Sequence, residues 1–148
     1  LTYDLHIAVR FELERALIAG TLSVAELPAA WNQAYRQKLG VTPRSDATGC
    51  LQDGHWATGM FGYFPTYTLG NVIASQLFQA AEAALGDQDE NFARGHFAPL
   101  FGWLRAHVHR FGHARSTRQI VEDASGKPLE PAALIARLRK KVRQLYDV

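Results

Sequence analysis

Residues 49–56 read Gly49-Cys50-Leu51-Gln52-Asp53-Gly54-His55-Trp56, and residues 59–67 read Gly59-Met60-Phe61-Gly62-Tyr63-Phe64-Pro65-Thr66-Tyr67. Glycine and proline punctuate both runs, so this segment predicts turns and loops rather than an ordinary helix. Binding and catalytic groups concentrate on loops that a rigid scaffold positions. A segment that carries Gln, Asp, His, Trp and two Tyr hydroxyls is therefore the candidate site of the chain.

On both sides of this segment apolar residues recur at helical spacing. In the first stretch, residues 3–19, the apolar stripe is Leu5, Val9, Leu13, Ala16 and Leu17. Further helices are predicted over residues 28–39, 67–85 and 97–111 and from Pro131 past Leu145, with a helical turn near Phe92. Ser23–Glu26 and Ser116–Gln119 have the spacing of capping boxes. The fold class is all-α, a multi-helix array with one Gly-rich loop segment and at most a short strand near residues 49–51.

The composition sets limits on partners and compartment. The 148 residues suit one domain and carry a formal net charge of +2, which is no footprint for nucleic acid. The last predicted helix carries a basic cluster of Arg137, Arg139, Lys140, Lys141 and Arg143. We interpret this cluster as a solvated helix face rather than as a patch for nucleic acid or anionic lipid. No apolar run approaches the roughly 20 residues that span a bilayer. Cys50 is the single cysteine, which fits a reducing cytoplasm.

Histidines elsewhere in the chain give a weak metal signal. His109 and His113 are spaced i, i+4, as two zinc ligands on one helix would be. Arg110, however, stands where a zinc-peptidase glutamate would follow the first histidine, and Gly112 weakens the helix. We therefore expect solvated or hydrogen-bonded histidines here, a structural role for His6, and no metal site in the chain.

His55 has a different setting, since Asp53, Trp56, Tyr63 and Tyr67 lie close to it in sequence. A histidine and tyrosine hydroxyls that converge on one point can stabilise a developing oxyanion, because each presents a directed donor. The alternative is a buried histidine with an aspartate partner and two core tyrosines, and the residues alone leave both readings open.

At these residues the chain resembles the carboxypeptidase Taq family of zinc metallocarboxypeptidases. Residues 49–56 fit that family's Gly-x-x-Gln-Asp-x-His-Trp signature, and residues 62–67 fit its Gly-Tyr-Phe-Pro-Thr-Tyr run. Residues 1–14 and the C-terminal residues 126–129 are also similar to the family. The resemblance implies peptide substrates, with His55 and one of Tyr63 or Tyr67 as catalytic donors to the tetrahedral oxyanion. It also implies that Gln52 and Asp53 position His55, with Asp53 orienting its ring, and that both belong with Trp56 to the substrate site. Arg10 and Arg115 are weak candidates for the substrate carboxylate.

The family's His-Glu-x-x-His zinc motif and its third ligand are missing from this sequence. The resemblance therefore implies that residues 1–148 are one C-terminal region of a longer helical enzyme, in which zinc or another divalent metal lies upstream. We expect the chain alone to be inactive, to hold no cofactor, and to cover its exposed apolar surface in a homodimer or by rearranging residues 49–67. Leu1 begins in mid-pattern without Met, which suits a fragment. The rival reading is a stand-alone helical interaction module without catalysis.

Overall fold

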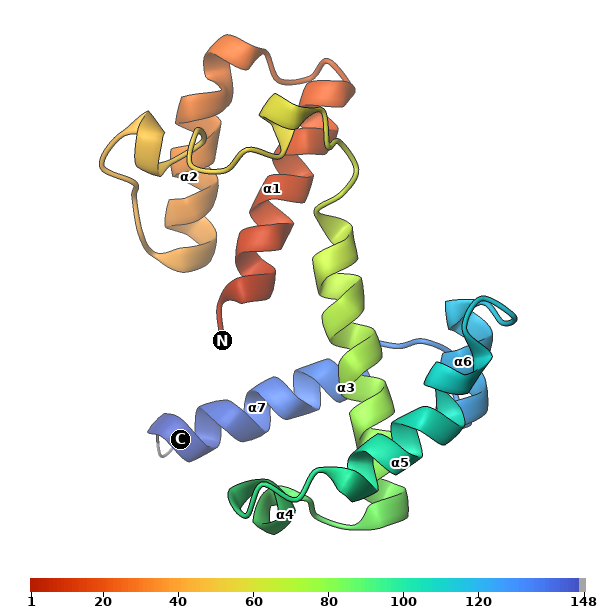
Figure 1. The fold of residues 1–148 in the computed structure, drawn as a ribbon. Coiled ribbons are helices and arrows are strands. Elements are labelled where there is room, and N and C mark those ends of the chain that lie inside the picture. Colours follow the sequence, from red (N-terminus) through yellow and green to blue (C-terminus); the bar gives the residue numbers. More distant parts are fainter. Residues whose placement is uncertain (147–148) are drawn as a thin grey trace. The chain divides into compact units, whose positions relative to one another are not determined.

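A computed structural model describes residues 1–146 and divides the chain into two compact units, residues 1–69 and residues 70–148. Within the described residues there are seven α-helices and four short 3-10 helices, and no strand (Figure 1). The predicted all-α class is confirmed, and residues 49–51, where a short strand was allowed, lie in turns.

The first unit is built on α1 (Tyr3–Ile18) and α2 (Leu27–Leu39). Trp31 stacks on Tyr35 within α2, with ring centroids 5.0 Å apart, and the two helices share a core that also holds Cys50. The capping box at Ser23 is confirmed, because Ser23 donates from its backbone N–H and its hydroxyl to Glu26 Oε2. Gly40 ends α2 at φ +70°, a left-handed conformation that favours glycine.

The stripe predicted for α1 is partly wrong. Leu5 is exposed, whereas Arg10 and Glu14, which fall between the predicted apolar positions, are buried. The reason is that the segment after α2 packs against α1 and supplies partners for both charges. That segment contains the 3-10 turns η2 (Asp46–Thr48) and η3 (Trp56–Thr58) and ends at α3 (Pro65–Leu85).

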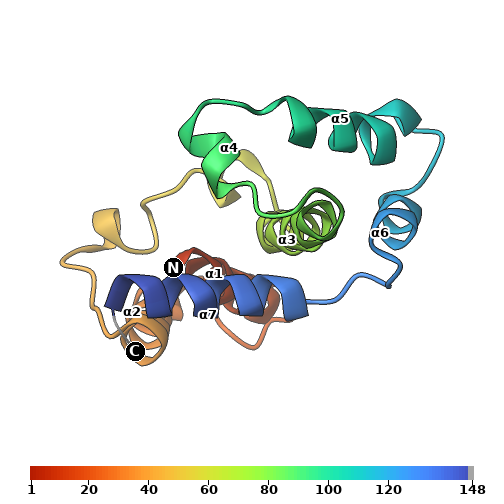
Figure 2. The same ribbon diagram turned by 90° about the horizontal axis from the view of Figure 1, so that it is seen from below.

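The second unit contains most of α3 followed by α4 (Asp89–Ala93), α5 (Ala98–His107), η4 (His109–Phe111), α6 (Thr117–Ser125) and α7 (Ala132–Tyr146). Figure 2 looks along α3 and shows α5, α6 and α7 around it. The core of the second unit joins α3, α5 and α6 through Leu77, Ala81, Trp103 and Val121. The buried Gln76 amide bridges α3 to the turn before α7: it donates to Ser125 Oγ and the Pro128 carbonyl and accepts from the Glu130 N–H, each at 3.0 Å.

One helix prediction in this unit is wrong in its extent. The helix predicted over residues 97–111 ends at His107, because Val108 leaves helical geometry at φ −127° and ψ −66°. Residues 109–111 form η4 instead. His109 and His113 therefore do not share one α-helical face. The capping box at Ser116 is confirmed by the bond from the Gln119 N–H to Ser116 Oγ, 3.3 Å.

Candidate active site

The candidate site lies in the first unit and centres on the imidazole of His55. Nδ1 of that ring lies 3.2 Å from Asp53 Oδ1, and Nε2 lies 3.0 Å from the Tyr67 hydroxyl. The ring packs on Phe64, which is 1% exposed, with centroids 4.6 Å apart. Three groups therefore fix the plane and the direction of this imidazole.

The protonation pattern of the pair follows from Asp53. Burial opposes ionisation of this carboxyl, but the hydrogen bond and charge of Arg10, with a further bond from His55, hold its pKa below its usual value. An ionised carboxylate only accepts hydrogen bonds, so Nδ1 of His55 donates to it. In the neutral ring Nε2 is then the acceptor, and the Tyr67 hydroxyl donates to it.

The surroundings of Tyr67 favour the protonated form that a tyrosine has at neutral pH. Partial burial raises its pKa, and the negative charges that Tyr63, Tyr3 and Asp53 carry when ionised raise it further. The rings of Tyr3 and Tyr63 meet that of Tyr67 edge-on, at 6.4 and 5.4 Å. Tyr67 is therefore a hydrogen-bond donor at neutral pH.

Arg10 holds the far side of Asp53. Its Nε donates to Asp53 Oδ2 at 2.7 Å, and its Nη1 donates to the Tyr35 hydroxyl at 2.8 Å and to the His6 carbonyl at 3.0 Å. The guanidinium also lies 4.9 Å from the centre of the Trp31 ring. Each of these contacts is inside the unit, so the Arg10 charge is matched by Asp53 before any ligand arrives.

His6 extends the network by one step. Its Nδ1 lies 3.1 Å from the Tyr35 hydroxyl. Burial and the nearby charge of Arg10 lower the pKa of His6, which favours the neutral ring as acceptor of the Tyr35 proton. The structure thus places His6 in a hydrogen-bonded role beside the site.

A cavity of about 540 Å³ opens over these groups, lined by both members of the His55–Tyr67 pair and by residues from the first two turns of α1. Tyr3, His6 and Arg10 face it from α1, and Asp53 and Phe64 from the loop. The imidazole of His55 and the phenol of Tyr67 therefore share a cavity, as an oxyanion site requires. Tyr63 does not line it, but its ring lies 6.1 Å from that of His55.

The other candidate residues lie as follows. Gln52 is exposed, and its backbone N–H donates to the Gly49 carbonyl. Trp56 is half-buried and donates from Nε1 to Glu14 Oε2. Arg115 lies in the second unit, where it pairs with Asp123 and covers the Phe111 ring. Glu14 and Tyr35 carry contacts of the site that no pattern in the sequence assigned, because their partners lie on distant segments.

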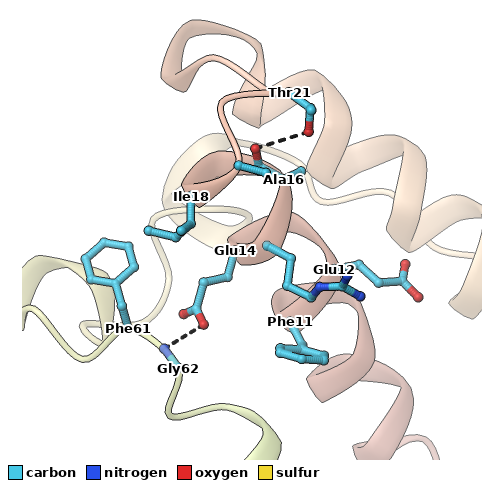
Figure 3. A pocket seen from close by; sticks show the side chains of 10 residues that line it. Phe11, Glu12, Glu14, Ala16, Ile18, Thr21, Phe61 and Gly62 are labelled. Atoms are coloured by element: carbon cyan, nitrogen blue, oxygen red, sulfur yellow. Dashed lines mark hydrogen bonds between the residues drawn. The ribbon is translucent and has the colours of Figure 1, made fainter.

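A larger hollow of about 780 Å³ lies between the end of α1 and the Phe61–Gly62 turn (Figure 3). Its lining, all within the described part of the chain, contains no histidine, cysteine or tyrosine. Ile18, Phe61 and Phe11 give it an apolar character. The His55–Tyr67 pair lines the smaller cavity, which is therefore the candidate active site.

Within residues 1–146 no group of three or more His, Cys, Asp or Glu side chains is placed to hold a metal ion. The donor set of this part of the chain therefore does not fit a metal centre. Across the same residues, none of the helices has both the length and the apolar character needed to cross a membrane.

Comparison with known proteins assigns the chain to a class. The model of the carboxypeptidase Taq (M32) metallopeptidase family matches residues 1–142. The chain belongs to this family of metallocarboxypeptidases, and the predicted resemblance is confirmed.

Comparisons with individual relatives agree with this assignment to the family. Thermostable carboxypeptidase 1 of Thermus thermophilus is 50% identical over 146 residues, which are 99% of this chain and 29% of that protein. The crystal structure of an M32 carboxypeptidase from Deinococcus radiodurans superposes with a TM-score of 0.94 at 45% identity, covering 100% of this chain and 30% of that one. Metallocarboxypeptidase 1 of Trypanosoma cruzi gives 0.90 at 34% identity, covering 95% of this chain and 29% of that one. The chain spans less than a third of the length of these relatives.

Proposed function

We propose that the first unit supplies one wall of the active site of a metal-dependent carboxypeptidase, which hydrolyses the C-terminal peptide bond of its substrates. The observation that carries the proposal is the 3.0 Å contact between His55 Nε2 and the Tyr67 hydroxyl in an open cavity, with the imidazole fixed by Asp53. Residues 1–148 would be the C-terminal region of the enzyme, and the metal, zinc or another divalent ion, would be held outside this chain.

The chain's own groups would act on the oxyanion that forms as the scissile carbonyl becomes tetrahedral. Tyr67 is the donor of the resting pair, and rotation about its C–O bond turns its proton from His55 Nε2 toward that oxyanion. Because the contact with His55 holds the phenol oxygen in place beforehand, only the hydroxyl proton has to turn as charge develops on the substrate. We favour Tyr67 over Tyr63 because Tyr67 is the tyrosine that bonds His55 and lines the cavity.

For Arg10 we propose a positioning role in place of a substrate contact. Its side chain is 11% exposed and bonded to Asp53, so capturing a substrate carboxylate would break the contact that orients His55. Gln52 and Trp56 remain candidates for shaping the substrate site, as Arg115 does for carboxylate binding. We also propose that the enzyme is cytoplasmic and that the isolated chain self-associates.

The test uses a full-length enzyme that contains this chain. Tyr67→Phe should lower kcat by roughly 10²–10³, with a smaller change in KM, as the loss of one oxyanion donor does. His55→Ala should also lower kcat, because it removes the acceptor that holds the Tyr67 hydroxyl in place. Tyr63→Phe is the matched control, since it removes a neighbouring phenol hydroxyl from outside the pair and should change kcat far less. If kcat is unchanged in both His55→Ala and Tyr67→Phe, these residues have a packing role and no catalytic one. The isolated chain should release no amino acid from a blocked dipeptide.

A further inference from the structure

The starting point is a carboxylate in the core of the first unit. Glu14 lies one helical turn after Arg10 on α1 and is 3% exposed. Burying a carboxylate is costly unless it is paired or hydrogen-bonded. Its surroundings should therefore show what holds it there and what it holds in return.

Both oxygens of Glu14 are used, each by a donor from the loop. Oε2 accepts from the Trp56 indole Nε1–H at 2.8 Å, and Oε1 accepts from the Gly62 backbone N–H at 2.7 Å. Figure 3 shows the second bond reaching across to the Phe61–Gly62 turn. One side chain thus fastens the loop at two points six residues apart.

These two points lead directly to the candidate active site. Trp56 follows His55 in the chain, and its ring meets Phe64 edge-on at 5.9 Å, while Phe64 packs on the His55 ring. The His55 carbonyl accepts from the Met60 N–H at 2.9 Å, which ties the same turn together. A shift of Trp56 or Gly62 would therefore be passed to the imidazole and to Phe64.

We propose that Glu14 is a positioning residue: its carboxylate clamps residues 56–62 so that His55 Nε2 meets the Tyr67 hydroxyl. Arg10 anchors the same loop through Asp53. A single face of α1 therefore holds the loop at Asp53, before His55, and at Trp56 and Gly62, after it. The use of the aligned pair rests on the proposed function. The alignment itself is a property of the chain and can be measured without substrate.

A residue that only stabilised the fold would act differently from a positioning residue. Its loss would lower the unfolding midpoint and leave His55 unchanged in molecules that stay folded. The ¹⁵N signals of the two His55 ring nitrogens separate these cases. A fixed neutral tautomer gives two widely separated signals, and exchange between tautomers draws them together.

The experiment compares Glu14→Gln with Glu12→Gln in the ¹⁵N-labelled chain, with His55→Ala used to assign the signals. The glutamine amide can accept from only one of the two loop donors and presents its own N–H groups to the other. Glu14→Gln should draw the two ring signals together and lower the protection of the Gly62 amide against hydrogen exchange. Glu12→Gln makes the same charge change at an exposed ion pair with Lys38 and should leave both readouts as in the wild type.

Trp56→Phe provides a second route, because it removes one donor and keeps an aromatic ring. It should move the His55 signals in the same direction by a smaller amount. If the His55 signals of Glu14→Gln equal those of the wild type, the proposal is overturned. If Glu14→Gln does not fold, wild-type His55 signals in Trp56→Phe overturn it instead. If the signals merge but a full-length Glu14→Gln enzyme keeps its kcat, the positioning stands and the proposed use of the pair fails.

Discussion

Asp53 connects two functional side chains, since it accepts from Arg10 with one oxygen and from His55 with the other. Its pKa is lower in the folded chain than in the unfolded one. The ionised form therefore stabilises the fold at any pH above the unfolded value, about 3.9. That contribution is lost as the pH falls through the folded pKa, because the native state must then take up a proton.

From this we predict that Asp53→Asn reduces the acid sensitivity of the first unit. The wild type should lose stability as the pH falls from about 5 toward 3, and the variant, less stable at pH 7, should lose less over that range. Urea midpoints at several pH values measure the difference. Asp46→Asn, at an exposed position of the same unit, should keep the wild-type pH profile. An equal acid loss in Asp53→Asn and wild type contradicts the linkage.

For single residues, the sequence predicted the side chains that form the candidate site. It did not predict all of the residues that hold those side chains in place. Asp53 and His55 stand in one signature and Tyr67 in the run that follows it, and the structure brings the three together. Glu14 and Tyr35 lie 41 and 20 positions before His55, counted along the printed sequence. Helical periodicity treats a charge among apolar residues as a boundary of the stripe. It gives no sign that a distant loop will supply hydrogen-bond donors to a buried carboxylate such as that of Glu14.

Among the helices, the ends that have a local chemical cause were predicted best. The serine caps predicted at residues 23 and 116, and the end of the second helix at residue 39, lie where the structure has them. The break at Val108 was missed, because valine tolerates a helix and no residue near it forces an exit before Gly112. Such a break depends on packing, which a local pattern does not record.

A glycine that follows one helix, Gly40, and a glycine inside another, Gly102, should respond to alanine with opposite sign. A Cβ at Gly40 or at Gly102 would meet nothing within 4 Å, so only the backbone decides. Gly40→Ala should destabilise by about 1–2 kcal/mol, the cost of a left-handed conformation. Gly102→Ala, inside α5, should stabilise by about 0.5–1 kcal/mol. Urea unfolding followed by tryptophan fluorescence tests both; a shared sign would contradict the argument.

At the scale of the whole chain, exposed apolar side chains occur in both units. Ile18, Leu51 and Phe101 are between 61% and 71% exposed. Relatives in the family are more than three times as long as the chain, since it spans 29% of Thermus thermophilus carboxypeptidase 1. Surface of this kind promotes association when its natural cover is missing.

We therefore predict that the isolated chain self-associates. Light scattering should show a mass that rises with concentration toward that of a dimer, and an apolar dye should bind at low concentration. Phe101→Ser should weaken the association without unfolding α5, because that side chain is exposed. A clean monomer that binds little dye would count against the prediction, as would equal association of the variant.

Cys50 gives this chain a built-in reporter. It is the only thiol in the sequence, and it is packed into the core of the first unit beside Leu13 and Trp31. Burial, followed by the charge of Asp46, raises its pKa, which makes it a poor nucleophile while it stays enclosed. The rate at which a maleimide modifies the chain therefore reports how often the hydrophobic core of the first unit opens to water.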